Sequence, residues 1–231
     1  MIKMTPKTRA VMDMAMASSL HFAGFELARM GTMALFTSGR TGFSSPAAAP
    51  FCTACVSPVS LIVLWAYTSS LERRGPRQSL WYSTVAFGLL LATAAIIIYA
   101  LEPYVDEHQV HRHLARMIIF GLNVCQNVLV QLVYTQHWSF LGSICPQVWF
   151  APIAGLGSVA STLAALAVSP LVDRLGLTGL LFVSSWFLVT SAMFGDHAYR
   201  IAQLVRYLPL HYVVLKYLAT TTISHVILYS F

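Results

Sequence analysis

The chain has 231 residues, of which 57% are hydrophobic and only 10% are charged, against roughly 25% charged residues in ordinary soluble domains. Its 14 Lys and Arg residues exceed its 8 Asp and Glu residues, which gives a net charge of +6. This composition excludes an ordinary soluble domain. Because the cations lie at the ends of apolar segments, where they would face lipid headgroups, it also argues against a nucleic-acid partner.

Four long runs contain no charged residue and indicate an integral membrane protein. They cover residues 41–71, 78–101, 117–172 and 175–195. A membrane-spanning helix needs about 20 mostly apolar residues, so the third run has room for two such helices. We therefore expect an all-α fold, a polytopic membrane helix bundle.

Taken in chain order, the apolar segments predict seven helices. We expect them at residues 10–37, 51–70, 79–101, 115–143, 147–170, 175–195 and 210–230. The first six should span the membrane. The seventh is short and contains Lys216, so we expect it to lie partly in the membrane interface. The chain would then be one membrane domain over residues 1–231, with a bundle at 1–206 and an extra C-terminal helix at 207–231.

Polar or breaker-rich segments separate these helices. A Gly/Ser/Pro/Ala loop covers 38–50, a basic breaker covers 72–77, and an acidic loop with three histidines covers 102–113. Asp173 and Arg174 predict a tight turn, and an amphipathic connector is expected at 196–206. With the N-terminus inside, the loops on that side hold eight Lys and Arg residues against four on the other, the distribution that favours this orientation.

Two stretches carry a family resemblance. Trp149–Ser158 reads W-F-A-P-I-A-G-L-G-S, while Pro58 lies nine residues before Tyr67 and Leu80–Tyr82 opens the next helix. Together they resemble the ATP/ADP translocases of plastids and of intracellular bacteria such as chlamydiae and rickettsiae. The resemblance covers about residues 22–205. It implies the N-terminal six-helix half of a twelve-helix, major-facilitator-like transporter.

The resemblance also implies a transport site that this chain has largely lost. The family carries an Arg in helix 1 with a Lys three residues later, and a Glu in helix 4. Here Arg29 remains, Thr32 stands at the Lys position, and Gln126 stands at the Glu position. Moving a nucleotide anion needs fixed charges at membrane depth. We therefore expect these three residues to be a degenerate transport site.

Several other residues are candidates for packing or binding. Small residues predict close helix contact at Gly155, Gly157, Ser158 and Ser161. Glu26 and Arg29, at i and i+3, are interpreted as a self-neutralised pair that faces the bundle, with a residual ligand or gating pair as the alternative. The polar residues of helix 4 favour interhelical hydrogen bonds, and they are Gln126, Asn127, Gln131 and Gln136.

Histidines within or near the spans are interpreted as hydrogen-bonded to neighbouring residues, with ligation of a chlorophyll or haem as the alternative, and they are His21, His137 and His225. The three histidines of the acidic loop match no common metal-site spacing, so no metal is expected. Lipids are expected as bound cofactors, with chlorophyll as a further candidate. No catalytic dyad or triad is recognisable, so we expect no enzyme.

Three functions from different classes stay open. The first is an accessory or structural subunit of a larger membrane complex, which has membrane lipids and other integral membrane subunits as partners. The second is a nucleotide carrier that restores twelve helices as a homodimer. The third is a pigment-binding photosystem or antenna subunit. The expected location is a plastid membrane, either thylakoid or envelope, or the mitochondrial inner membrane.

Overall fold

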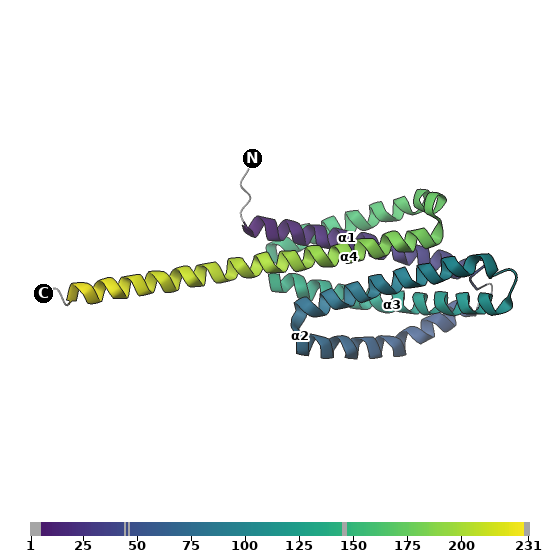
Figure 1. The fold of residues 1–231 in the computed structure, drawn as a ribbon, viewed down its shortest axis with the longest axis horizontal. Helices are drawn as coiled ribbons and strands as arrows, with labels where there is room; N and C mark the ends of the chain where they lie inside the picture. The colour runs from purple at the N-terminus through teal and green to yellow at the C-terminus, as the bar shows by residue number, and fades with distance from the viewer. Residues whose placement is uncertain (1–5, 44, 46, 145–146, 229–231) are drawn as a thin grey trace.

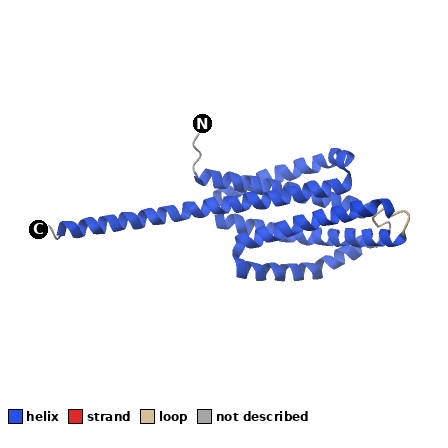
Figure 2. Cartoon of the chain, viewed as in Figure 1, coloured by secondary structure: helices blue, strands red, loops and turns tan. Residues whose placement is uncertain are grey.

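The computed structural model describes residues 6–43, 45, 47–144 and 147–228, and all of their side chains except those of residues 7, 130–140, 142–144 and 204–228. Every regular element in these ranges is helical, which confirms the expected all-α class (Figure 2). The elements are α1 (Pro6–Thr37), α2 (Ala48–Leu101), a 3-10 helix (Glu102–Tyr104), α3 (Gln109–Ile144), a second 3-10 helix (Gln147–Trp149) and α4 (Phe150–Leu228).

Two of these helices, α2 and α4, are each broken at one glycine, where the chain turns back on itself (Figure 1). Gly75 has φ 76° and ψ 170°, and Gly176 has φ 72° and ψ 176°. These backbone angles are essentially restricted to glycine. Pro76 follows the first break and suits the first turn of a new helical arm. The breaks therefore divide each long helix into two arms.

Alanine at Gly176 should destabilise the folded chain. No atom lies within 4 Å of the Cβ that alanine would add there, so the whole penalty comes from the backbone angles and is on the order of 1–3 kcal/mol. Thermal unfolding of the detergent-solubilised protein measures it. The control is Gly121→Ala inside α3, which also meets nothing within 4 Å and should be neutral or stabilising. Equal unfolding temperatures for the two variants would contradict this account of the break.

Two helices are long and apolar enough to cross a membrane, judged by length and composition. They cover Ala48–Tyr104 and Gln147–Gln203, which is the result expected of a membrane protein. Across the part of the chain that the structure describes, this test finds these two alone, so the expectation of six spanning helices is not supported. The six helical arms that the glycine breaks create do correspond in order to the first six helices expected.

The expected break between the sixth and seventh helices is wrong. α4 continues without a break from Gly176 to Leu228, so the expected connector at 196–206 is helical. The physical reason is that this segment contains no glycine or proline, and its alternation of charged and apolar residues suits an amphipathic helix as well as a linker. In Figure 1 the C-terminal part of α4 extends beyond the other helices. The basic segment 72–77 is likewise helical except at Gly75.

Polar contacts between distant segments mark the two ends of the bundle. At one end, which we call the N-terminal end, His197 Nδ1 lies 2.9 Å from Asp13 Oδ2, next to an ion pair between Arg77 and Asp196. At the other end, which we call the loop end, the Arg116 side chain donates to the Gly42 carbonyl at 2.9 Å. α1 therefore runs from the N-terminal end to the loop end.

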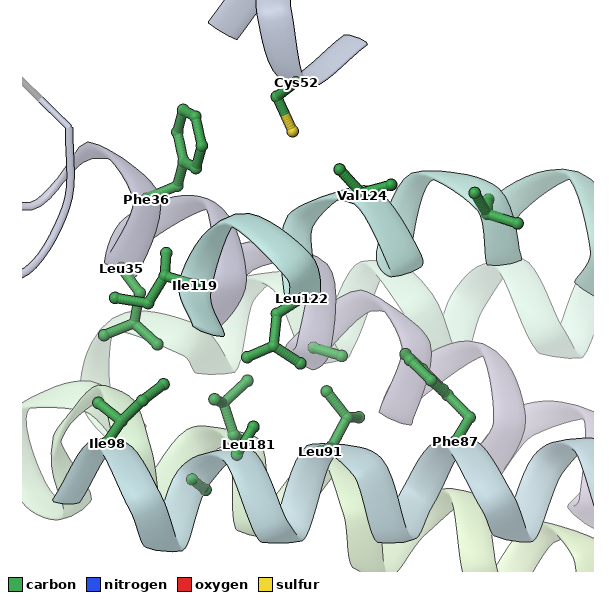
Figure 3. Packing of buried hydrophobic residues seen from close by; sticks show 14 of the residues in the cluster. Leu35, Phe36, Cys52, Phe87, Leu91, Ile98, Ile119, Leu122, Val124 and Leu181 are labelled. Atoms are coloured by element: carbon green, nitrogen blue, oxygen red, sulfur yellow. The ribbon is translucent and has the colours of Figure 1, made fainter. Parts of the chain in front are cut away.

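The core lies where α1, α2, α3 and α4 meet (Figure 3). Its large buried side chains include Leu35, Phe36, Phe87, Leu91, Ile98, Ile119, Leu122 and Leu181. Buried serines of α4 add hydrogen bonds between helices. Ser185 donates to the Gly88 carbonyl at 2.7 Å, and Ser191 donates to the Ala17 carbonyl at 2.7 Å. Such contacts need backbones that approach closely, which small residues allow.

Candidate functional site

Glu26 and Arg29 form a two-pronged ion pair on α1. Arg29 Nε donates to Glu26 Oε2 at 3.0 Å, and Arg29 Nη2 lies 2.5 Å from Glu26 Oε1. The Glu26 side chain is only 13% exposed, whereas that of Arg29 is 52% exposed. The pair is therefore self-neutralised, as interpreted from the sequence. Glu26 is largely covered by the bundle, whereas the Arg29 side chain lies at the outer surface.

The position of this pair along α1 is unusual for charged groups, because it lies far from both ends of the helix. Helices rise about 1.5 Å per residue, so Glu26 lies about 20 Å from Asp13 at the N-terminal end, and Arg29 lies about 12 Å from Thr37, where α1 ends. Beside the pair, Met30 and Met33 are exposed apolar side chains. We call Glu26, Arg29, Met30 and Met33 the α1 outer face, because their spacing of three and four residues places them on one side of the helix.

The other two degenerate transport-site positions lie inside the packed bundle. Thr32 and Gln126 are both buried, and Gln126 Nε2 donates to the Phe25 carbonyl of α1 at 3.2 Å. This is the interhelical hydrogen bond expected for Gln126, whereas Asn127 Nδ2 donates within α3 to the Asn123 carbonyl at 2.8 Å. The side chains of Gln131 and Gln136 lie outside the described residues. Thr32 and Gln126 are therefore enclosed in the bundle, whereas the Arg29 side chain is exposed at its surface.

The small residues of α4 do not share one contact. Gly157 is buried, and a Cβ there would lie 2.7 Å from Cδ2 of Phe22 on α1. Gly155 and Ser158 are exposed, and Ser161 is half-buried. Gly157 thus makes the close helix contact expected and Gly155 does not, because a helix turns by about 100° per residue and carries neighbours to other faces.

Alanine at Gly157 should therefore destabilise the contact between α1 and α4, while alanine at Gly155 should not. The added methyl group of Gly157→Ala overlaps the Phe22 ring, and overpacking of this kind costs about 1–3 kcal/mol. At Gly155 the same methyl group meets nothing within 4 Å. Thermal unfolding in detergent compares the two variants. A lower unfolding temperature for Gly155→Ala than for Gly157→Ala would contradict the packing.

The histidines considered as pigment ligands are only partly described. His21 is buried, and its ring meets that of Phe22 edge-on at 6.2 Å. It lines a cavity of about 20 Å³ together with Trp81 and Asp196, which has room for about one water molecule and not for a chlorin ring. The side chains of His137 and His225 lie outside the described residues. Across the described part of the chain, no three His, Cys, Asp or Glu side chains are grouped as metal ligands.

Sequence reasoning missed the charged cluster at the N-terminal end. Asp196 accepts from Arg77 Nε at 2.6 Å and from Arg200 at 2.9 Å, while Asp13 contacts His197. A signal was present, because Arg77 and Asp196 border the charge-free runs 78–101 and 175–195 on the side expected to be inside. Charges that border two spans at the same membrane face can pair with each other.

Comparison with known proteins gives no relative. No protein family, no curated protein and no solved structure matches this chain. The functional argument therefore rests on the residues and on their arrangement.

Proposed function

We propose that this chain is an integral membrane accessory subunit of a larger membrane complex, with a fold that resembles half of an ATP/ADP translocase and no transport activity. The observation that carries the proposal is the Glu26–Arg29 pair, in which the Arg29 side chain is half exposed well inside the length of α1. In this proposal the six helical arms cross the membrane. The membrane is a plastid membrane or the mitochondrial inner membrane.

An exposed arginine at this height favours a protein neighbour. A charged side chain at the centre of a bilayer costs at least about 2.5–3.5 kcal/mol when it faces lipid, so such residues almost always face other protein or a water-filled cavity. Glu26 neutralises part of that cost, but the Arg29 side chain remains 52% exposed. A second membrane protein packed on the α1 outer face would shield the Arg29 side chain from lipid.

The residues at the degenerate site support the proposed loss of transport. An adenine nucleotide brings several negative charges and needs more than one cation. Arg29 is already paired with Glu26, and Thr32 carries no charge. Gln126 has a neutral amide, which donates to the Phe25 carbonyl, so it cannot serve as the counter-charge that the family places there. The chain retains exposed surface that another membrane protein can contact.

A homodimeric carrier is the second candidate, because a second copy of the chain could also cover the α1 outer face. It would restore twelve helical arms around the two Arg29 residues. The charge argument above disfavours this candidate. A homodimeric carrier should transport nucleotide, whereas an accessory subunit should not, so a transport assay separates these two candidates.

An exchange assay tests the proposal. Proteoliposomes that contain only this chain should exchange labelled ATP for internal ADP no faster than protein-free liposomes. The matched variants are Arg29→Ala and Arg174→Ala, since Arg174 is an exposed arginine away from the α1 outer face. Saturable exchange that Arg29→Ala abolishes and Arg174→Ala preserves would overturn the accessory role and favour the homodimeric carrier.

A further inference from the structure

An open groove of about 530 Å³ lies at the loop end, between the connection that follows α1, the first turns of α2 and the start of α3. It is far larger than the cavity beside His21 and falls within the range of about 300–1,000 Å³ usual for small-molecule sites. Its lining residues include Phe43, Phe51, His113, Arg116, Met117 and Phe120. We call it the loop-end groove.

Aromatic rings form the floor of this groove. The Phe120 ring centroid lies 5.7 Å from that of Phe51 and 6.2 Å from that of Phe43. Phe51 is 64% exposed and Met117 is 73% exposed. An apolar surface of this kind, open to its surroundings, suits a hydrocarbon chain.

The charges around the groove leave one arginine unpaired. Arg40 Nη2 lies 2.9 Å from Asp106 Oδ2, and Arg112 Nη2 lies 3.6 Å from Asp106 Oδ1. Arg116, in contrast, has the Gly42 carbonyl as its one hydrogen-bond partner in the described part of the chain. Among the described residues no carboxylate lies within ion-pair distance of Arg116, and His113 is exposed beside it. The groove therefore joins a free positive charge to an apolar floor.

The position of Arg116 places that charge at headgroup level in the proposed membrane. The charge-free run 117–172 begins directly after it, and the run 41–71 begins directly after Arg40. Cations at the ends of spans lie where phosphate groups are found, with their aliphatic stems along apolar surface. Phe51, Met117 and Phe120 would then lie on the acyl-chain side.

We propose that the loop-end groove binds one anionic phospholipid, with its phosphate group at Arg116 and His113 and an acyl chain along Phe51, Met117 and Phe120. The inference rests on the membrane location in the proposed function but not on the accessory role. A free inorganic anion would satisfy the arginine and leave the apolar floor uncovered. A lipid satisfies both.

Native mass spectrometry of the full-length protein tests this proposal. The detergent-solubilised chain is titrated with dioleoyl phosphatidylglycerol or dioleoyl phosphatidylcholine, which share their acyl chains and differ in net charge. One cation near an anionic lipid contributes about 1 kcal/mol, so wild type should retain phosphatidylglycerol about fivefold more strongly. Arg116→Gln should bring the ratio of phosphatidylglycerol binding to phosphatidylcholine binding close to one. Arg174→Gln should leave this ratio unchanged.

Two further variants separate the headgroup from the chain. Arg116→Lys keeps the charge and should keep the preference. Phe51→Ala removes part of the floor and should weaken both lipids without changing their ratio. An unchanged ratio in Arg116→Gln, or equal binding of both lipids by wild type, would overturn the proposal.

A measurement on the wild-type chain avoids dependence on the folding of any variant. Photoactivatable phosphatidylglycerol should label peptides that contain Phe51 or Met117 more than the choline analogue does. Equal labelling by the two lipids would overturn the lipid site. The accessory role would stand in that case, because it is tested by transport and by protein partners.

Discussion

Replacing Glu26 and Arg29 together by glutamine should release the chain from its native assembly. The double variant removes both charges and leaves neither one unpaired, so the isolated chain should unfold at nearly the same temperature. A partner that contacts the pair would lose charge-assisted hydrogen bonds worth about 2–5 kcal/mol at an interface. Subunits that co-purify with a tagged chain should therefore fall by at least about tenfold.

The control for this experiment is an ion pair at the loop end. Arg40→Gln with Asp106→Asn removes an exposed pair, together with the longer contacts of these two residues to Glu102 and Arg112, and it should leave the co-purifying subunits in place. If both double variants release the same subunits, or if neither does, the α1 outer face is not the interface. A double variant that also loses its folded state in isolation would show that the pair acts within the chain.

Replacing Asp196 by asparagine should lower the free energy of unfolding by about 1–3 kcal/mol. Asp196 pairs with Arg77, and the two side chains are only 20% and 30% exposed. Breaking a buried ion pair costs about 3–5 kcal/mol, and breaking a surface pair costs about 0–1 kcal/mol. We therefore expect an intermediate cost for this partly buried pair. The second partner, Arg200, is 66% exposed and adds little.

Chemical or thermal unfolding in detergent measures this effect. Asp173→Asn is the matched control, because Asp173 is exposed beside the Gly176 break. The control should unfold like wild type. Equal stability of the two variants would contradict the view that the cluster of Arg77, Asp196 and Arg200 holds α2 and α4 together at the N-terminal end.

Much of the fold could be predicted because local sequence decides it. The charge-free runs located the apolar arms. The breaks at Gly75 and Gly176 fall within or beside the expected breakers at 72–77 and at Asp173 and Arg174, since only glycine adopts these backbone angles readily. α1 was predicted at 10–37 and observed at Pro6–Thr37. The length of α4 was missed because a charged segment without glycine or proline continues a helix.

The site was harder to predict because exposure depends on tertiary packing. Spacing placed Glu26 and Arg29 on one side of α1, but it did not reveal that α3 and α4 pack elsewhere and leave this side open. For the same reason Gly155 and Gly157, two residues apart, have opposite surroundings. Thr32 and Gln126 matched a transport site by sequence position alone. Their burial is a property of the assembled bundle.

The central claim is that another membrane protein covers the α1 outer face. It is tested most directly by a photocrosslinking amino acid placed at Met33, which is 56% exposed on that face, with the chain in its native membrane. After irradiation, the account predicts one crosslinked product that contains a different membrane subunit and migrates with a larger native complex. Crosslinks to lipid alone, or only to a second copy of this chain, would contradict it.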